Sequence, residues 1–449
     1  MTGQVSSLLN QFRLYQNAPP GETIPVVFHA RVHAVSDRHP SNECIILQMR
    51  DQNIFLRVHV NVENVHHASF GIAQTCALES VVRVSGTLVL TEQHPLPEYN
   101  VIAGVVQASE LVMVSQAIDG LVTRPPLKST KAHEPDGESS GCSDVLKLNE
   151  RLNNRVLDIR CTARSSIFKL MSGVWELAVE FCLANGFQQF PGDDDYFPLS
   201  YYNQQQAWLT QTFEIHIQIA LTMDFLPGCF SIGSLYRRES ELSRRRLCEF
   251  TGLEVALPIE RDWTELLDKT EDLFIFVIHA LQEREKFRYL TTLAKRVCSS
   301  AGTFRLGLDG NGKMARLTFS ESKRLLRDHG GNNSNDEDDM TPQDEADLGY
   351  LMRHHPPAPN PQTDIFMMME QPVSTHSFQY HASMAGPSEK AKTTNSGDVI
   401  MRGQEACTVL QCYHDPGLLR AAMQALLIYN VAITFGGERF KCQEALITY

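Results

Sequence analysis

Hydrophobic and polar residues alternate along several short segments in the first quarter of the chain. In VVFHARVHAV, apolar residues such as Phe28 and Val32 alternate with polar ones such as His29, and this period of two indicates a strand with one buried face. Four more segments have strand character: CIILQMR, IFLRVHV, SVVRVSGTLVL and NVIAGVVQASELVMV. Short strands separated by polar turns predict an OB-type β-barrel over residues 24–116, a fold whose open face often binds single-stranded nucleic acid. A barrel without a nucleic-acid role is an equal alternative.

The hydrophobic period changes to that of a helix in ARSSIFKLMSGVWELAVEFCLANGF. Apolar residues recur there at helical spacing from Ile167 to Cys182, and Gly186 stands where a helix C-cap is expected. This pattern predicts a helix over residues 165–185 whose broad apolar face belongs to a core or a subunit interface. Strand-like segments (AWLTQTF, CFSIGSLYRR and CEFTGLEVAL) and a long helical one (WTELLDKTEDLFIFVIHALQERE) follow. The mixture predicts an α+β domain built on an antiparallel sheet.

Breaks in composition divide the chain into domains. A chain of 449 residues is too long for one ordinary core, and RPPLKSTKAHEPDGESSG is rich in Pro, Ser, Gly and charge, as linkers are. We expect a solvated loop at the acidic segment 329–348 and weak structure in the polar stretches of 353–397. The predicted parts are an N-terminal extension (1–23), the barrel (24–116), a linker (117–148) and the α+β domain (149–449).

Composition and charge narrow the possible functions. The net charge of -13, with 43% hydrophobic and 21% charged residues, indicates a globular chain that does not coat nucleic acid by charge alone, although a local basic patch is allowed. The 11 cysteines include no CxxC pair, which is typical of reduced thiols in an intracellular protein. The N-terminus lacks the apolar core of a signal peptide, and no apolar run is long enough to cross a bilayer. We expect a cytoplasmic protein without membrane association.

Two short segments suggest binding sites but have simpler explanations. GLDGNGKM looks superficially like a phosphate loop, yet Met314 stands where Ser or Thr is needed, so a hairpin turn at Asp309–Gly310 is favoured. CTVLQCYH brings Cys407, Cys412 and His414 together in sequence, but without the spacing or the fourth ligand of a zinc site.

A cluster of arginines is harder to explain. IGSLYRRESELSRRRLCEFTGLEV carries five arginines in an otherwise acidic chain, between two strand-like segments. Arginines on adjacent strands could hold a polyphosphate by bidentate contacts, and Phe250 could stack on a purine. By composition alone, a solvated basic turn that balances nearby acids would be favoured.

The wider pattern favours the functional explanation. FSIGSLYRRESELSRRRLCEFTGLEVAL resembles motif 2 of the class II aminoacyl-tRNA synthetases of the eukaryotic and archaeal aspartyl type. The likeness continues in order through RLNNRVLDIR, AWLTQTFEIHIQ, TPQDEADLGYLM, TDIFMMMEQP and NSGDVIMRGQEACTVLQCYHDPGLL, and in the barrel through ESVVRVSGTLV. The resemblance implies an OB-fold barrel followed by a class II antiparallel-sheet catalytic domain, with a homodimer formed through the 165–185 helix. It also implies an aspartate–tRNA ligase that uses ATP, Mg²⁺, L-aspartate and an aspartate-type tRNA in protein biosynthesis.

The resemblance assigns roles to individual residues. Aspartate would attack the α-phosphorus of ATP to give an aminoacyl-adenylate, and the aminoacyl group would then pass to the tRNA 3′ end. Mg²⁺ prefers oxygen ligands, which suits a carboxylate pair. The matching positions are Arg237 and Arg439 as catalytic arginines, Glu239, Arg246 and Phe250 as further ATP contacts, and Asp398 and Glu405 as the Mg²⁺ carboxylates.

The amino-acid site departs from the family pattern. Ile217 stands where the family has a lysine that binds the aspartate carboxylate, Cys412 where it has the arginine that clamps the side-chain carboxylate, and Glu214 where it has a glutamine. A carboxylate moved into a pocket without these cations loses several kcal/mol. The other positions that match this site are Gln211 and Glu254.

Further departures lie outside this pocket. Val409 replaces a glycine of the family motif, Ile45 stands where an anticodon-stacking aromatic is expected, with Phe55 as a possible substitute, and motif 3 is reduced to FGGERFKCQEALITY. Three hypotheses follow: an aspartate–tRNA ligase with impaired aminoacylation, a catalytically inactive paralogue that binds nucleotide and tRNA or a protein partner, and a ligase for a different amino acid.

Overall fold

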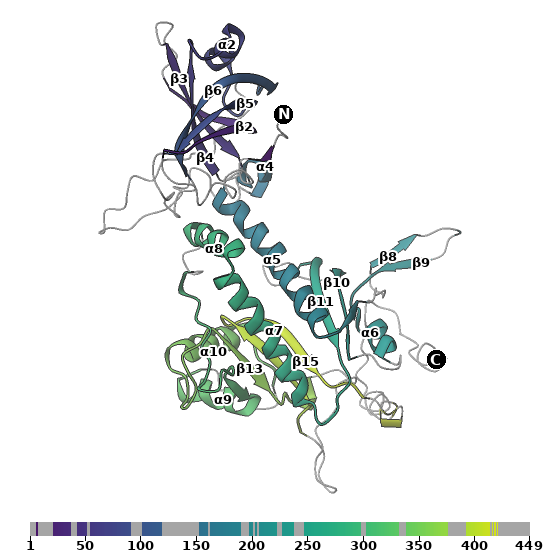
Figure 1. Ribbon diagram of the computed structural model, residues 1–449. Coiled ribbons are helices and arrows are strands. Elements are labelled where there is room, and N and C mark those ends of the chain that lie inside the picture. The colour runs from purple at the N-terminus through teal and green to yellow at the C-terminus, as the bar shows by residue number, and fades with distance from the viewer. Residues whose placement is uncertain are drawn as a thin grey trace. The chain divides into compact units, whose positions relative to one another are not determined.

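The chain forms two compact units, each with hydrophobic clusters of its own (Figure 1). One comprises Met1–Met171 with Arg284–Gly302, and the other Ser172–Glu283 with Thr303–Tyr449. The computed structural model describes residues 6–7, 21–36, 43–51, 54–90, 101–118, 152–159, 162–189, 197–200, 203, 206–221, 227–237, 247–297, 302–331, 338–375, 392–413, 415, 417–418 and 420. Most of the predicted N-terminal extension and linker lies outside these ranges.

The N-terminal unit contains the predicted barrel. Its strands are β2 (Thr23–Val35), β3 (Cys44–Asp51), β4 (Ile54–Asn61), β5 (Val81–Leu90) and β6 (Val101–Ser115), and the helix α2 (His67–Thr75) connects β4 to β5 (Figure 1). The pairing order is β1-β2-β3-β4-β6-β5, with β1 at Ser6–Ser7, and an additional β2–β5 pairing closes the barrel. The OB-type prediction is confirmed.

Strand alternation explains the barrel core. Phe28 and Val32 are 1% and 0% exposed, whereas His29 lies on the solvent side. Ile45 is 1% exposed and packs inside the barrel, so it does not take the place of a stacking aromatic on the surface. Phe55 is half-buried, and its ring centroid lies 5.1 Å from that of His33 in an edge-to-face arrangement.

A buried ion pair holds the turn before β5. Arg50 is 7% exposed, and its Nη2 lies 2.8 Å from both carboxylate oxygens of Glu79. Glu79 has a left-handed backbone with φ 70, and its amide donates to the Val32 carbonyl at 2.7 Å. Since this conformation is unfavourable for a residue with a side chain, the contacts stabilise a backbone that Glu79 would not otherwise favour.

The helix predicted at 165–185 is α5 (Thr162–Ala184). The chain turns directly after it at Gly186, which has φ 77, and the Phe187 amide donates to the Cys182 carbonyl at 3.0 Å to cap the last turn. Part of the apolar face stays exposed on this chain, at Ile167, Phe168, Met171 and Leu183.

The second unit is the predicted α+β domain. A three-stranded sheet, in the order β11-β10-β7, is formed by β7 (Gln188–Gln189), β10 (Cys229–Tyr236) and β11 (Glu249–Ala256). A four-stranded sheet follows the chain order β12 (Arg316–Thr318), β13 (Ile365–Met369), β14 (Ser396–Met401) and β15 (Glu405–Leu410). β8 (Phe197–Ser200) pairs only with β9 (Gln206–Leu209) among the described strands. The β10–β11, β13–β14 and β14–β15 pairs are antiparallel, whereas β7–β10 and β12–β13 are parallel.

Helices complete the two units. The segments assigned to the first unit include α4 (Arg155–Asp158) and α8 (Glu285–Val297), besides the first part of α5. The second unit contains α6 (Glu214–Leu221), α7 (Thr264–Glu283), α9 (Phe319–Asp328), α10 (Pro342–His354) and the 3₁₀ turn Val373–Thr375. Among the helices of the described residues, none has the length and hydrophobicity needed to cross a membrane.

The expectation of a solvated loop over the acidic segment 329–348 is wrong from Pro342 onward, because the helix α10 begins there. Thr341 and Asp344 form a capping box in which each side chain accepts the other's amide, at 3.1 and 3.0 Å. Proline at the first helical position reinforces this start. The helix then buries Leu348, which is 1% exposed. A strong local cap and an apolar face outweigh the acidic composition.

The turn predicted at Asp309–Gly310 is confirmed. Asp309 and Lys313 face each other, with a 2.8 Å bond from the Asp309 amide to the Lys313 carbonyl, and Leu308 bridges Met314. The Asp309 carboxylate accepts the amides of Asn311 and Lys313 at 2.8 and 2.9 Å. Since this carboxylate already binds the loop amides, the segment does not offer them to a phosphate.

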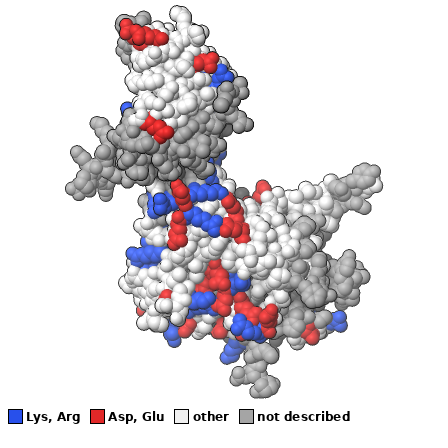
Figure 2. Space-filling view, in the orientation of Figure 1, with Lys and Arg blue, Asp and Glu red and all other residues white. Residues whose placement is uncertain are grey.

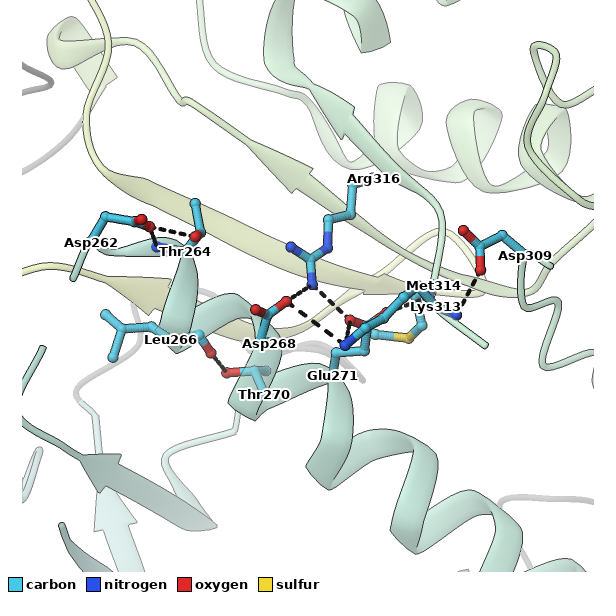
Figure 3. Close-up of polar contacts among 10 residues, drawn as sticks. All are labelled: Asp262, Thr264, Leu266, Asp268, Thr270, Glu271, Asp309, Lys313, Met314 and Arg316. Carbon is cyan, nitrogen blue, oxygen red and sulfur yellow. Dashed lines mark hydrogen bonds and ion pairs between the residues drawn. The ribbon is translucent and has the colours of Figure 1, made fainter. Parts of the chain in front are cut away.

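A network of charged residues joins α7 to β12 (Figure 3). Glu271 is fully buried, and Arg316 Nη2 lies 2.6 Å from both Glu271 Oε2 and Asp268 Oδ1. Lys313 Nζ lies 3.2 Å from the same Glu271 oxygen, and the Met314 amide donates to the other. On the face drawn in Figure 2, the described basic side chains lie next to acidic ones and do not form a continuous basic surface.

Candidate functional site

The hairpin of β10 and β11 carries the residues predicted to bind ATP. Its register pairs Leu235 with Phe250, and the Arg237 amide donates to the Cys248 carbonyl at 3.0 Å. The Arg237 guanidinium carbon lies 5.0 Å from the centroid of the Phe250 ring, which is within the range of a cation–π contact. The hairpin therefore places a planar cation and an aromatic face side by side.

Glu254 connects the same hairpin to the start of α6. Its two carboxylate oxygens accept the Thr212 hydroxyl at 2.9 and 3.0 Å, and one also accepts the Phe213 amide at 2.7 Å. Burial raises the pKa of Glu254, and the charge of Glu214 adds to this effect, while the bonds from Thr212 and Phe213 and the charge of Arg237 oppose it. These bonds fix the beginning of α6 relative to β11.

A second group of contacts joins α6 to the segment after β15. Gln218 Nε2 donates to Glu214 Oε1 at 3.0 Å and to Cys412 Sγ at 3.2 Å, and Cys412 Sγ donates to Glu214 Oε1 at 3.5 Å. Burial raises the pKa of Glu214. Burial and the Glu214 charge raise the pKa of Cys412 to about 12, so this thiol keeps its proton near neutral pH.

Ile217 lies on α6 between the two polar residues Glu214 and Gln218 in sequence, but its side chain is buried. It is 3% exposed. The thiol of Cys229 donates to the Ile217 carbonyl at 3.1 Å. The position that we expect to correspond to a family lysine is therefore part of an apolar core, formed with Phe213, Ala220, Cys229 and Leu235.

The two predicted metal carboxylates lie on neighbouring strands. Asp398 is on β14 opposite Thr408, and Glu405 begins β15. Gln371 Nε2 donates to Asp398, while the Thr408 hydroxyl donates to Glu405 Oε1 at 2.8 Å. Burial raises the pKa of Asp398 to about 7, and the charge of Glu405 contributes further. A buried carboxylate next to a second carboxylate forms with it a donor pair that a divalent cation would stabilise.

This carboxylate pair does not extend into a larger metal cluster. Within the described ranges, no group of three or more His, Cys, Asp or Glu side chains is arranged to hold a metal ion. Burial and the charges of Asp398 and Glu405 raise the pKa of Cys407 to about 12. A protonated thiol is a poor zinc ligand.

The structure brings many, but not all, of the predicted residues together. Arg237 and Phe250 form one pair, and Glu214, Glu254 and Cys412 lie around the start of α6. Asp398 and Glu405 lie on the paired strands β14 and β15. Gln211 is half-buried between β9 and α6. Glu239, Arg246 and Arg439 lie outside the described residues, as do Arg244, Arg245 and His414.

Sequence reasoning missed four polar residues that organise this region. Thr212 binds Glu254 and Gln218 binds Glu214, while Gln371 binds Asp398 and Thr408 binds Glu405. Thr212 could have been found as a polar residue two positions before a helix, since its hydroxyl accepts the Glu214 amide at 3.1 Å. Gln218 could have been found from its position four residues after Glu214 on the same helix, whereas Gln371 and Thr408 gave no such signal.

Comparisons with known proteins show which family the chain resembles. The family model for class II tRNA synthetases (D, K and N) matches residues 147–436. The cytoplasmic aspartate–tRNA ligase of Homo sapiens is 28% identical over 407 residues, covering 87% of this chain and 75% of that protein. The cytoplasmic aspartate–tRNA ligase 2 of Arabidopsis thaliana is 27% identical over 417 residues, covering 88% and 69%.

Solved structures show the same fold. The aspartyl-tRNA synthetase of Entamoeba histolytica superposes with a TM-score of 0.71 at 22% identity, covering 95% of this chain and 82% of that one. The asparaginyl-tRNA synthetase of Pyrococcus horikoshii, in complex with asparaginyl-adenylate, superposes with a TM-score of 0.66 at 18% identity, covering 95% and 87%.

Proposed function

This chain belongs to the class II tRNA synthetases (D, K and N), and we propose that it is an aspartate–tRNA ligase-type protein that binds ATP with Mg²⁺. We further propose that its charging of tRNA with aspartate is impaired. One observation carries the second part of this proposal. Where the family motif has a lysine and an arginine for the aspartate carboxylates, this chain has Ile217 in an apolar core and a protonated Cys412.

Arg237 and Phe250 support the nucleotide half of this proposal. A guanidinium offers donors in a planar fork that matches phosphate oxygens, and an aromatic ring provides a surface for the adenine. The 5.0 Å separation of the two groups puts both within reach of one nucleotide. Glu239, Arg246 and Arg439 are assigned to the same site by the family motif, and their geometry lies outside the described residues.

Asp398 and Glu405 would hold the Mg²⁺. Their oxygens are the ligand type that this ion prefers, and each already receives one hydrogen bond that orients its carboxylate, from Gln371 and Thr408 respectively. When bound, Mg²⁺ supplies positive charge against the phosphates of the nucleotide. The residues present therefore fit the ion.

The amino-acid half would not hold aspartate well. An aspartate side chain brought to Cys412 would lie near the Glu214 carboxylate, which accepts the Cys412 thiol at 3.5 Å. Like charges at such a site repel, and a buried carboxylate without a cationic partner loses several kcal/mol. Each 1.4 kcal/mol weakens binding about tenfold, so we expect aspartate affinity to fall by several orders of magnitude.

An inactive paralogue that binds nucleotide and tRNA, or a protein partner, is the second candidate. The mutual bonds among Glu214, Gln218 and Cys412 favour it, because they engage the groups that would otherwise recognise an amino-acid side chain. On the barrel, the edge-to-face pair of His33 and Phe55 is where we propose that an unpaired base of tRNA would stack.

We also propose a homodimer through α5, the helix through which the family resemblance implies dimerisation. Its exposed apolar residues include Phe168 and Met171, which are 42% and 51% exposed on this chain. Exposed apolar surface on one helix face is typical of an interface. Met171→Glu should shift the protein to a monomer in light scattering. A variant that keeps the oligomeric state of the parent protein would contradict this interface.

Calorimetry tests the proposed function in two steps. Titration of MgATP should give saturable heat, and Arg237→Ala should weaken that binding at least tenfold, which is the loss of about 1.4 kcal/mol expected for a charge-assisted contact. Titration of L-aspartate into the protein saturated with a non-hydrolysable ATP analogue should give no saturable heat. Micromolar aspartate binding would overturn the proposal, and absence of MgATP binding would refute both candidates.

A further inference from the structure

The helix α10 touches the turn between the two strands that carry Asp398 and Glu405. This turn consists of Arg402 and Gly403, which have φ values of 52 and 71. Two hydrogen bonds between Met401 and Gln404, at 2.8 and 3.2 Å, close it as a two-residue hairpin. Because Glu405 stands two residues after Gly403, the position of the turn determines where its carboxylate lies.

Backbone contact between two glycines sets this position. A Cβ atom added to Gly349 on α10 would lie 2.4 Å from the Gly403 amide nitrogen and 2.5 Å from its Cα. A Cβ added to Gly403 would lie 2.7 Å from Ala346 Cα. Both glycines are buried. Separations this small cannot accommodate a side chain, so the helix and the turn are packed backbone against backbone.

A polar contact adds to the glycine packing. Glu345, one turn before Gly349 on α10, accepts the amide of Glu405 itself at 3.4 Å through Oε2. The other side of the turn is held by Asp364, whose carbonyl accepts the Arg402 amide at 2.7 Å. The turn is thus fixed from two directions.

We infer that α10 is a positioning element for the metal site: the Gly349–Gly403 contact and the Glu345 carboxylate hold Glu405 at the distance from Asp398 at which both can bind one divalent ion. This inference rests on the proposed function, since it needs Asp398 and Glu405 to be the metal ligands. Glu345 acts through the main chain of Glu405 and not as a ligand.

Binding of Mn²⁺ tests the inference without reference to catalysis. The full-length protein is mixed with a non-hydrolysable ATP analogue and titrated with Mn²⁺, and the free ion is followed by electron paramagnetic resonance. Gly349→Ala should weaken Mn²⁺ binding tenfold or more. Gly71→Ala is the matched control, because Gly71 also lies in a helix and an added Cβ there meets nothing within 4 Å; its Mn²⁺ affinity should equal that of the parent protein.

Two variants of Glu345 separate positioning from ligation, and they decide the question even if Gly349→Ala does not fold. Glu345→Gln keeps an oxygen that can accept the Glu405 amide and should retain Mn²⁺ affinity, whereas Glu345→Ala should lose it by several-fold. Equal losses in both variants would make Glu345 a charged ligand and overturn the positioning role.

The remaining outcomes distinguish the inference from the function on which it rests. If the parent protein binds Mn²⁺ with the analogue and folded Gly349→Ala binds it equally well, the inference fails and the proposed metal site stands. If the parent protein binds the analogue but not Mn²⁺, the assignment of Asp398 and Glu405 fails, and the inference fails with it.

Discussion

Replacing Ile217 by lysine, the residue type that the family motif has at this position, should strongly destabilise the protein. Ile217 is 3% exposed and packs with Phe213, Cys229 and Leu235. Full burial of an isoleucine side chain contributes roughly 1.5–3 kcal/mol, and an ammonium group in the same cluster would be a buried charge without a partner. We expect Ile217→Lys to lower the free energy of unfolding near neutral pH by about 3–5 kcal/mol.

The effect should depend on pH in a defined direction. Burial depresses the pKa of the introduced lysine in the folded state, so the unfolded state binds the proton more tightly. The free energy of unfolding of the variant should therefore rise with pH between two pKa values of the lysine: the depressed pKa in the folded state and the ordinary pKa of about 10.4 in the unfolded state. Urea unfolding followed by circular dichroism, at pH ~7 and at pH ~9.5, measures this change.

Ile217→Met is the control, because it changes shape but not charge and should cost less than about 1.5 kcal/mol. The lysine and methionine variants should differ most near neutral pH and less at alkaline pH. Equal stability at neutral pH would mean that the side chain of residue 217 reaches solvent or a counter-charge. In that case, the placement of Ile217 in an apolar core would be wrong, and a lysine there could serve the substrate.

Three further predictions concern other parts of the chain. Glu214→Gln should raise the free energy of unfolding near neutral pH, because burial raises the pKa of Glu214 and penalises its ionised form. The free energy of unfolding of the parent protein should fall as pH rises from the ordinary pKa of 4.5 through the raised pKa. If urea unfolding gives the same pH dependence for the variant and the parent protein, this prediction is wrong. Glu79→Gln should cost about 3–5 kcal/mol in the same assay, because it leaves Arg50 buried without its carboxylate, and a loss below about 1 kcal/mol would mean that the pair is solvated. Phe250→Ala should weaken MgATP binding by about 5- to 150-fold in calorimetry, since stacking contributes about 1–3 kcal/mol. The control Phe250→Tyr keeps the ring and should bind MgATP as the parent protein does. If the alanine variant also binds MgATP as the parent protein does, Phe250 is not part of the nucleotide site.

The parts of the fold that the sequence predicted are those with a strong local period. Alternation in VVFHARVHAV corresponds directly to the buried and exposed faces of β2, and the apolar spacing after Ile167 corresponds to α5. The start of α10 was missed because acidic composition over a long segment was weighed above the capping box at Thr341. A local cap specifies helix initiation more directly than average composition does.

In the candidate site, too, the contacts that could be predicted are those within one local motif. Arg237 and Phe250 lie on the two strands of one hairpin, so the motif that contains them also predicts that they are close. The bond between Thr212 and Glu254 joins residues 42 positions apart, and that between Gln218 and Cys412 joins residues 194 positions apart. Such pairs form only through tertiary packing, and no local pattern encodes them.

Aspartate-dependent exchange between ATP and pyrophosphate is the measurement that tests the central claim most directly, because it reports aminoacyl-adenylate formation without requiring tRNA. The same exchange assay would be run with each of the other standard amino acids in place of aspartate, beside a MgATP-binding control on the same preparation. We propose that Ile217 and Cys412 stand where the family has two cations, and this proposal predicts no exchange above background for aspartate from a protein that binds MgATP. Exchange with another amino acid would show a ligase of changed specificity. Exchange with aspartate at a rate typical of tRNA ligases would contradict the account and show that these residues rebuild a working aspartate pocket.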